Sequence, residues 1–241
     1  MAIYAIGDLH LSFQNPKPMD IFGDNWENHA EKIKQNWIKN VTQEDTVLLL
    51  GDFSWAMYLE DAKLDFEFLH RLPGKKILLK GNHDYWWTTI TKMKQYLKEN
   101  NFNEMYFLYN NSYLVEDKIV VGTRGWTITD IEEDNKMIKR EYNRLELSFK
   151  DAINKFGTEK EIIVCMHYPP INKSAIENKE QLCFVNLMKK YNVKKCLYGH
   201  LHGKSHKDAV EGTFYNIDFK LISSDYLNFR LYSLKNDISI E

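Results

Sequence analysis

The stretch "KKILLKGNHDYWW", Lys75–Trp87, decides the fold class of this chain. Its apolar run, Ile77 to Leu79, is short and ends close to a glycine, which is typical of a parallel strand buried on both faces. A polar cluster, Gly81–Asp84, follows almost at once. The pattern therefore predicts side chains with chemical function at the carboxyl end of a buried strand.

Similar apolar runs recur along the chain and alternate with longer amphipathic segments. The other predicted strands are Ala2–Asp8, Thr46–Asp52, Lys118–Gly125, Glu161–His167 and Lys194–His200. The predicted helices are Trp26–Lys39, Leu59–Arg71, Thr88–Lys98, Asp134–Phe156 and Lys179–Tyr191. Such alternation favours an α/β layer fold with largely parallel strands.

Two regions depart from this alternation. The segment Gly212–Lys235 is rich in aromatic and branched residues without helical period, so we expect antiparallel strands there. The segment Phe107–Gly122 resembles hairpin-linked strands, with Asn110 and Asn111 in one turn and Asp117 in the next. The sequence therefore predicts two packed sheets flanked by helices.

One predicted helix also specifies which of its faces should be buried. In Leu59–Arg71, Leu64 and Phe68 recur at helical spacing, whereas Asp65 is expected to face water. Pro73 and Gly74 then end the helix.

The composition limits the number of domains and the kinds of partner that the chain can have. A chain of 241 residues with 44% hydrophobic and 27% charged residues can bury one full core, so we expect a single domain spanning residues 1–241. A net charge of −2, from 32 basic and 34 acidic residues, argues against nucleic acid as a partner. Nothing in the sequence indicates an oligomeric state.

The expected location is the cytoplasm. Met1–His10 contains no basic segment followed by a long apolar stretch, and no run of about eighteen apolar residues predicts membrane insertion. Cys165, Cys183 and Cys196 are far apart and form no C-x-x-C pair, which is typical of reduced thiols in a cytosolic protein.

Polar side chains follow five of the predicted strands. They are Asp8, His10, Asp52, Asn82, His167, His200 and His202. Because the carboxyl ends of parallel strands share one edge of a sheet, we expect these side chains to converge. The pairs Asp8 and His10, and His200 and His202, are two residues apart, and in extended backbone such pairs point to the same side.

This donor set indicates two metal ions. Three oxygen donors and four imidazoles exceed the four ligands of one tetrahedral zinc. They suit two divalent or trivalent transition-metal ions of the Mn, Fe, Zn or Co type, with Asp52 as the carboxylate shared between them. Glycines at positions 51, 81 and 199 allow the backbone to approach the site closely.

The motifs "GDLH", "GD", "GNHD", "MHYP" and "GHLH", in this order from Gly7 to His202, resemble the motif series of the calcineurin-like metallophosphoesterases. The resemblance implies a four-layer αββα sandwich of two mixed β-sheets flanked by helices, with a dinuclear centre that hydrolyses phosphoesters. By the same resemblance, one ion is held by Asp8, His10, Asp52 and His202, and the other by Asp52, Asn82, His167 and His200.

The resemblance also implies a place for His83 beside the scissile phosphate, with Asp84 orienting it. Two cations about 3.5–4 Å apart can activate a bridging hydroxide for in-line attack on phosphorus. The leaving group then needs a proton or a nearby positive charge, which His83 can supply. Asp84 can fix the tautomer of that imidazole, as carboxylates next to catalytic histidines commonly do.

Three further residues are candidates for the substrate-binding wall: Arg124, Trp126 and Tyr168. A packing role for the two aromatic residues, and a surface ion pair for the arginine, are the alternatives. His206 is a further candidate near the rim. The stretch "GDFSWA" at Gly51 lacks the arginine of the corresponding motif in protein Ser/Thr phosphatases, which favours a small phosphodiester or phosphomonoester as substrate.

Two other functions stay open at this point. One is a nuclease, against which the net charge argues. The other is a non-catalytic metal-binding scaffold of the same fold, against which the complete set of ligands argues.

Overall fold

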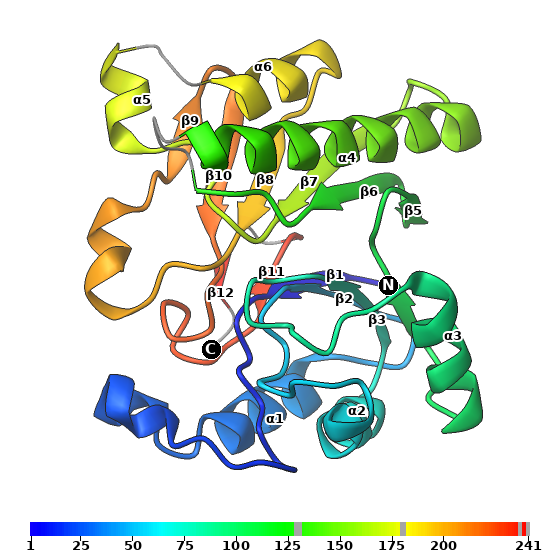
Figure 1. Ribbon diagram of the computed structural model, residues 1–241. Helices are drawn as coiled ribbons and strands as arrows, with labels where there is room; N and C mark the ends of the chain where they lie inside the picture. Colours follow the sequence, from blue (N-terminus) through cyan, green and yellow to red (C-terminus); the bar gives the residue numbers. More distant parts are fainter. Residues whose placement is uncertain (128–131, 179–181, 236–237, 240–241) are drawn as a thin grey trace.

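The computed structural model describes residues 1–127, 132–178, 182–235 and 238–239. In these ranges the chain forms two six-stranded mixed sheets that pack face to face, with helices on both outer faces (Figure 1). The four layers therefore run helix, sheet, sheet, helix. The predicted αββα sandwich is confirmed.

The first sheet has the strand order β12-β11-β1-β2-β3-β4. Its strands are β1 (Ile3–Ile6), β2 (Thr46–Leu50), β3 (Lys75–Leu79), β4 (Met105–Phe107), β11 (Tyr232–Ser233) and β12 (Ile238–Ser239). The four strands from β1 to β4 are parallel, whereas β11 and β12 are antiparallel to their neighbours.

The second sheet has the strand order β5-β6-β7-β8-β10-β9. Its strands are β5 (Ser112–Val115), β6 (Lys118–Thr123), β7 (Glu161–Met166), β8 (Lys195–Tyr198), β9 (Gly212–Phe214) and β10 (Ile217–Leu221). Strands β6, β7, β8 and β10 are parallel, and the edge strands β5 and β9 are antiparallel to their neighbours.

Each sheet has its own helical layer. The helices over the first sheet are α1 (His29–Asn40), α2 (Lys63–His70) and α3 (Ile90–Glu99). Those on the side of the second sheet are α4 (Glu132–Phe156), α5 (Lys173–Asn178) and α6 (Cys183–Lys190) (Figure 1). Among the described residues, no helix is both long enough and apolar enough to span a membrane.

Burial on both faces explains why the central strands are continuous apolar runs. In β2, Val47 and Leu49 belong to the core under the helices, while Leu48 and Leu50 belong to the core between the two sheets. Since both sets are buried, the run from Val47 to Leu50 contains no polar residue, and Asp52 comes only after the strand has ended.

Some predicted elements differ from the structure in their bounds or in how they are connected. Trp26 lies in a 3-10 turn, so α1 begins at His29. Helix α6 covers only part of the predicted Lys179–Tyr191, of which residues 179–181 lie outside the described residues. The turn at Asn110 and Asn111 is not a hairpin, because β4 belongs to the first sheet and β5 to the second.

The other two predictions for strands are confirmed in part. Strands β5 and β6 form the expected hairpin around Asp117. The C-terminal segment contributes to both sheets, and β10 is parallel to β8 although antiparallel to β9. Its β11 returns to the first sheet and pairs antiparallel with β1.

The predicted faces of α2 are wrong at Leu64 and Asp65, whereas Lys63 is exposed as expected. Asp65 is 1% exposed, accepts a hydrogen bond from the Phe13 N–H at 2.9 Å, and pairs with the hydroxyl of Ser54. Leu64, by contrast, is 39% exposed. Helical spacing suggested the wrong stripe because a buried carboxylate with two partners can replace an apolar residue on the inner face.

Candidate metal centre

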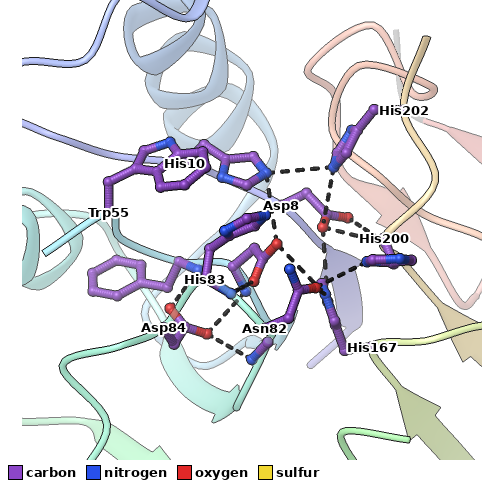
Figure 2. A network of polar contacts seen from close by, with 12 residues as sticks. Asp8, His10, Trp55, Asn82, His83, Asp84, His167, His200 and His202 are labelled. Carbon is purple, nitrogen blue, oxygen red and sulfur yellow. Dashed lines mark hydrogen bonds and ion pairs between the residues drawn. The ribbon is translucent and has the colours of Figure 1, made fainter. Parts of the chain in front are cut away.

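The predicted ligand side chains converge at the carboxyl ends of five strands. Figure 2 shows six of them, Asp8, His10, Asn82, His167, His200 and His202, and Asp52 contacts His10 and His167. Asp8 and His10 follow β1, Asp52 follows β2, Asn82 follows β3, His167 follows β7, and His200 and His202 follow β8. The expected convergence of these side chains is therefore seen in the structure, and both sheets contribute to one cluster.

Two groups within this cluster could each hold a metal ion: Asp8 with His10 and His202, and Asp8 with Asp52 and His167. In the first group, His10 Nε2 and His202 Nε2 are 3.4 Å apart, and His202 Nε2 lies 3.4 Å from Asp8 Oδ1. In the second, His167 lies 3.7 Å from Asp8 Oδ1 and 3.5 Å from Asp52 Oδ2.

Asn82 and His200 complete the cluster on the side of the second sheet. The amide oxygen of Asn82 lies 2.6 Å from His167 Nε2 and 2.9 Å from His200 Nδ1. Asp52 reaches both sides, because its Oδ2 is also 3.8 Å from His10 Nε2. Asp8 and Asp52 therefore each lie within 4 Å of imidazoles from both candidate groups: Asp8 near His167 and His202, and Asp52 near His10 and His167.

The ligand pairs do not converge through extended backbone, as the spacing of two residues had suggested. Asp8, His10, Asp52 and His200 all have positive φ, at 61°, 47°, 50° and 75°. Left-handed backbone is uncommon for residues other than glycine and costs about 1–3 kcal/mol at each position. The tight turns after the strands, and not strand geometry, aim these side chains.

Two glycines let neighbouring strand ends approach these carboxylates. A Cβ on Gly81 would overlap Asp52 Oδ1, and a Cβ on Gly199 would overlap Asp8 Oδ2. Without side chains at these positions, the backbone N–H of His200 donates to Asp8, with its nitrogen 3.0 Å from Oδ2. The predicted role of these glycines in close approach is borne out.

Two of the histidines are oriented by their second ring nitrogen. His167 Nδ1 lies 3.0 Å from the carbonyl oxygen of Leu50, to which it can only donate, so its Nε2 presents a lone pair.

His202 Nδ1 is 2.8 Å from Asp225 Oδ1. Sequence reasoning missed Asp225, although it follows β10 just as the ligands follow their strands. His206 Nε2 lies 3.2 Å from the other oxygen of Asp225.

Burial makes most of the imidazoles neutral. It lowers the pKa of His10 and His167 below the usual range, and burial together with His167 lowers the pKa of His200 to about 3. Neutral imidazoles are the form that binds a metal ion. His202 differs: burial by itself would lower its pKa, but Asp8 and Asp225 raise it to about 10.

The carboxylates behave as a close pair. Burial and the neighbouring Asp8 raise the pKa of Asp52 to about 8. Burial by itself raises the pKa of Asp8, but the surrounding histidines, His202 first, bring it below the usual range. Two buried carboxylates that share neutral imidazoles and an amide oxygen form an arrangement that divalent cations would compensate. The residues present therefore fit a dinuclear centre.

His83 stands beside this cluster. Its backbone N–H donates to Asp52 Oδ1 at 2.7 Å, and its ring centroid lies 4.3 Å from the ring of Trp55. Trp55 in turn stacks on His10, with centroids 4.9 Å apart. The Nζ of Lys17 lies 4.0 Å from the centre of a Trp55 ring, a contact that no sequence signal indicated.

The predicted contact between Asp84 and His83 was wrong. Asp84 accepts hydrogen bonds from the backbone N–H groups of Asp52, Phe53, Ser54 and Gly81 and from the indole of Trp86. These five donors occupy both of its oxygens. Among the described residues, His83 Nδ1 is buried without a hydrogen-bond partner. Asp84 therefore fastens the turn after β2 to the turn after β3, and aromatic packing orients His83.

In a comparison with known protein families, one family model matches this chain. It is described as calcineurin-like phosphoesterase, and it matches residues 1–204. The chain belongs to this family. Membership implies a metal-dependent hydrolase with a dinuclear centre. Among curated proteins, no sequence matches the chain.

Solved structures show the same fold. A protein of unknown function from Aquifex aeolicus is 20% identical with a TM-score of 0.52, and the match covers 98% of this chain and 96% of that one. A phosphopantetheinyl hydrolase from Mycobacterium tuberculosis is 11% identical with a TM-score of 0.54, covering 92% and 88%. TT1561 of Thermus thermophilus is 16% identical with a TM-score of 0.54, covering 84% and 82%.

The three candidate wall residues of this calcineurin-like phosphoesterase form a row that leads away from His200. The ring of Tyr168 lies 4.1 Å from that of His200, and the ring of Trp126 lies 5.6 Å from Tyr168. The guanidinium carbon of Arg124 is 4.7 Å from a Trp126 ring centre. Arg124 also lies 3.8 Å from the buried carboxylate of Glu141, so an ion pair engages its charge.

Metal binding should release protons and weaken as the pH falls. In the metal-free protein, Asp52 and His202 hold protons at neutral pH, because their pKa values are about 8 and about 10. A metal ion needs both in the deprotonated form. Calorimetric titration with Mn²⁺ in two buffers of different ionisation enthalpy should show release of at least about one proton per chain, and affinity should fall about tenfold per pH unit for each proton. Equal heats in both buffers would contradict this assignment.

Asp84→Ala should destabilise the fold and empty the metal centre together. It leaves four backbone N–H groups unpaired, so we expect the free energy of unfolding to fall by at least about 3 kcal/mol. The turns that carry Asp52 and Asn82 would loosen with it. Denaturant unfolding and elemental analysis measure the two effects.

Asp45→Ala is a matched control, because Asp45 is also buried and accepts from the backbone N–H groups of Ala2 and Thr42. It should destabilise the protein without lowering metal content. Wild-type stability and metal content in Asp84→Ala would show that the five hydrogen bonds do not support the centre.

Proposed function

We propose that this protein is a phosphoesterase with two metal ions that hydrolyses a small phosphomonoester or phosphodiester, with His83 assisting the leaving group. The observation that carries the proposal is a buried cluster of two carboxylates, an amide oxygen and four imidazoles with a further histidine, His83, beside it and outside the ligand set (Figure 2). Family membership supports the reaction class.

The distances support a division of the ligands into two sets. We assign Asp8, His10, Asp52 and His202 to one ion, and Asp52, Asn82, His167 and His200 to the other. Asp52 Oδ2 lies 3.8 Å from His10 and 3.5 Å from His167, which favours Asp52 as the shared ligand. Asp8 belongs to both candidate groups as well, with its Oδ1 3.4 Å from His202 and 3.7 Å from His167, so the choice of Asp52 as the shared ligand rests on the resemblance of the motifs.

The ions would supply Lewis acidity and lower the pKa of the attacking water. Hydrolysis adds that water across the ester: phosphorus gains its oxygen, the P–O bond to the alcohol breaks, and the leaving oxygen takes up a proton. The residues of the chain hold the phosphoryl group in line and manage that proton.

His83 is suited to the leaving group. Burial, His167 and Lys17 lower the pKa of His83 to about 4, so its imidazole is neutral at neutral pH. A neutral imidazole can donate a hydrogen bond to the leaving oxygen, and a bound phosphate dianion would favour its protonated form. Packing against Trp55 restricts the ring, and Lys17, over the same indole, adds a positive charge nearby.

The row Tyr168, Trp126 and Arg124 begins beside His200. We propose that Tyr168, and through it Trp126, forms one wall of the substrate site. Arg124 would support this wall from behind, since it is paired with Glu141 and packed against Trp126.

Reconstitution of metal-free protein tests the function. With Mn²⁺, Fe²⁺, Zn²⁺ or Co²⁺ we expect about two ions per chain and hydrolysis of p-nitrophenyl phosphate or its bis ester that a chelator abolishes. Asp52→Asn should lower the occupancy of both sites, whereas Asp20→Asn, an exposed position, should not. Cleavage of single-stranded DNA in preference to both esters would support a nuclease instead, and bound metal without hydrolysis would support a scaffold.

His83→Ala should leave both ions in place and slow turnover by about 10²–10⁴-fold, the usual range for a lost acid or base. The defect should be smaller for p-nitrophenyl phosphate than for an alkyl phosphate, because p-nitrophenolate leaves without a proton. His70→Ala removes an exposed histidine and serves as the control. Loss of an ion in His83→Ala would identify His83 as a ligand, and equal defects for both substrates would exclude its role at the leaving group.

A further inference from the structure

Residues 12–19 form a strap that follows the first two ligands and is held at both ends. At its start, the backbone N–H of Phe13 donates to the buried carboxylate of Asp65 at 2.9 Å. At its end, the side chain of Met19 is 5% exposed, and its sulfur accepts the indole N–H of Trp55 at 3.2 Å. The strap is therefore fixed against the loop that follows β2 and against α2.

The backbone of the strap is also fixed locally at Lys17. Pro16 and Pro18 flank this residue, and a residue that precedes proline is restricted to extended backbone. The N–H of Lys17 donates to the hydroxyl oxygen of Ser12 at 3.0 Å, and the same hydroxyl donates to the carbonyl oxygen of Lys17 at 3.4 Å. The exposed side chain of Lys17 therefore starts from a defined position.

This side chain lies close to the metal centre. Its Nζ is 4.0 Å from the centre of a Trp55 ring. The Trp55 ring in turn lies 4.3 Å from that of His83 and 4.9 Å from that of His10 (Figure 2). The ammonium group thus packs on the same indole as a predicted ligand and the histidine assigned to the leaving group.

The charge of Lys17 has no acidic partner. In the part of the chain that the structure describes, no carboxylate oxygen lies within 4.0 Å of its Nζ. Lys34 and Lys150, by contrast, each pair with a glutamate of their own helix, and Arg124 lies 3.8 Å from the buried Glu141. An ammonium group over an indole, with no carboxylate beside it, keeps its donors free for an anion.

A phosphate group at the centre would be an anion of this kind. Lysine carries three donors on a flexible stem, so Nζ can turn from the indole to an oxygen nearby while the backbone of the strap stays in place. A phosphomonoester carries about −1.5 to −2 charges at pH 7, whereas a diester carries a single negative charge. A cation at this position therefore favours the monoester.

We infer that Lys17 is a substrate-binding residue, whose ammonium group contacts an unesterified oxygen of the phosphoryl group next to His83, and that the strap presents it there. The inference rests on the proposed function, because the metal centre and His83 define where the phosphoryl group lies. It also gives a role to the buried Asp65, which holds the strap at Phe13.

Binding of inorganic phosphate to the Mn²⁺-loaded protein tests this contact without catalysis. Lys17→Met keeps an apolar stem over the indole and removes the charge, so calorimetric titration should show an affinity about ten- to hundredfold lower at unchanged metal content. Lys17→Arg keeps the charge and should recover most of that affinity. Lys94→Met removes an exposed lysine of α3 and is the control. Equal phosphate affinity in wild type and Lys17→Met would overturn the inference.

A comparison of p-nitrophenyl phosphate with its bis ester tests the preference for the monoester, because both release the same leaving group. Lys17→Met should lower kcat/KM about ten- to hundredfold for the monoester and several times less for the diester. Equal losses for the two esters would contradict a contact that depends on the charge of the phosphoryl group.

Ser12→Ala tests the role of the strap, because it removes the hydroxyl that contacts both backbone groups of Lys17. It should lower the affinity for phosphate about two- to tenfold in the wild-type protein and leave it unchanged in Lys17→Met. A loss of the same size in both backgrounds would show that Ser12 does not act through Lys17.

Failure of this inference and failure of the proposed function give different results. Unchanged phosphate affinity in Lys17→Met, with hydrolysis intact in wild type, would overturn the inference alone. Absence of hydrolysis in wild type, with phosphate binding that depends on Lys17, would overturn the proposed function and support the contact.

Discussion

The closeness of two buried carboxylates, Asp8 and Asp52, is the constraint on which the rest of the structure depends. Both lie within 3.7 Å of the same imidazole, His167, and both are almost completely buried. Two negative charges so close together would repel strongly where water is excluded, and burial together with this repulsion raises the pKa of Asp52 to about 8 while the pKa of Asp8 stays below its usual range. Only a scaffold that is stable without their help can hold them, and the three apolar cores supply that stability.

The same constraint explains the local backbone. Each aspartate sits in a left-handed turn, and each faces a glycine of another strand end that leaves room for its oxygens. Asp84 accepts hydrogen bonds from the backbone N–H groups of Asp52 and Gly81, and so joins the turn after β2 to the turn after β3. The carboxylate of Asp84 thereby holds the turn that carries Asp52 in place. The consecutive residues of the "NHD" triplet therefore have separate tasks: Asn82 completes the donor cluster, Asp84 supports the backbone, and His83 faces the leaving group in the mechanism that we propose.

The fold class and the donor cluster could be predicted from the sequence because both depend on local patterns. Apolar runs that end in Asp, Asn or His mark buried parallel strands, and topology brings their carboxyl ends together. The partners of Asp84 could not be predicted, since a carboxylate that accepts from amides about thirty residues away has no local signature. Asp65 was missed for the same reason, because burial with a distant hydroxyl is a property of the tertiary structure. Asp225 follows a strand as the cluster residues do, but its contact with His202 could not be predicted from that position.

The return of β11 to pair with β1 bears on how the protein matures during synthesis. Strand β1 pairs with residues near the end of the described chain, and Asp8 is bonded to His200, which lies 192 positions further on. Contacts of such long sequence separation form late, after most of the chain has left the ribosome. A nascent chain therefore exposes one edge of β1, and its two halves of the donor cluster stay apart until β8 has emerged. The complete donor cluster therefore exists only in the folded protein, and a chain that ends before β8 offers a metal ion only part of it.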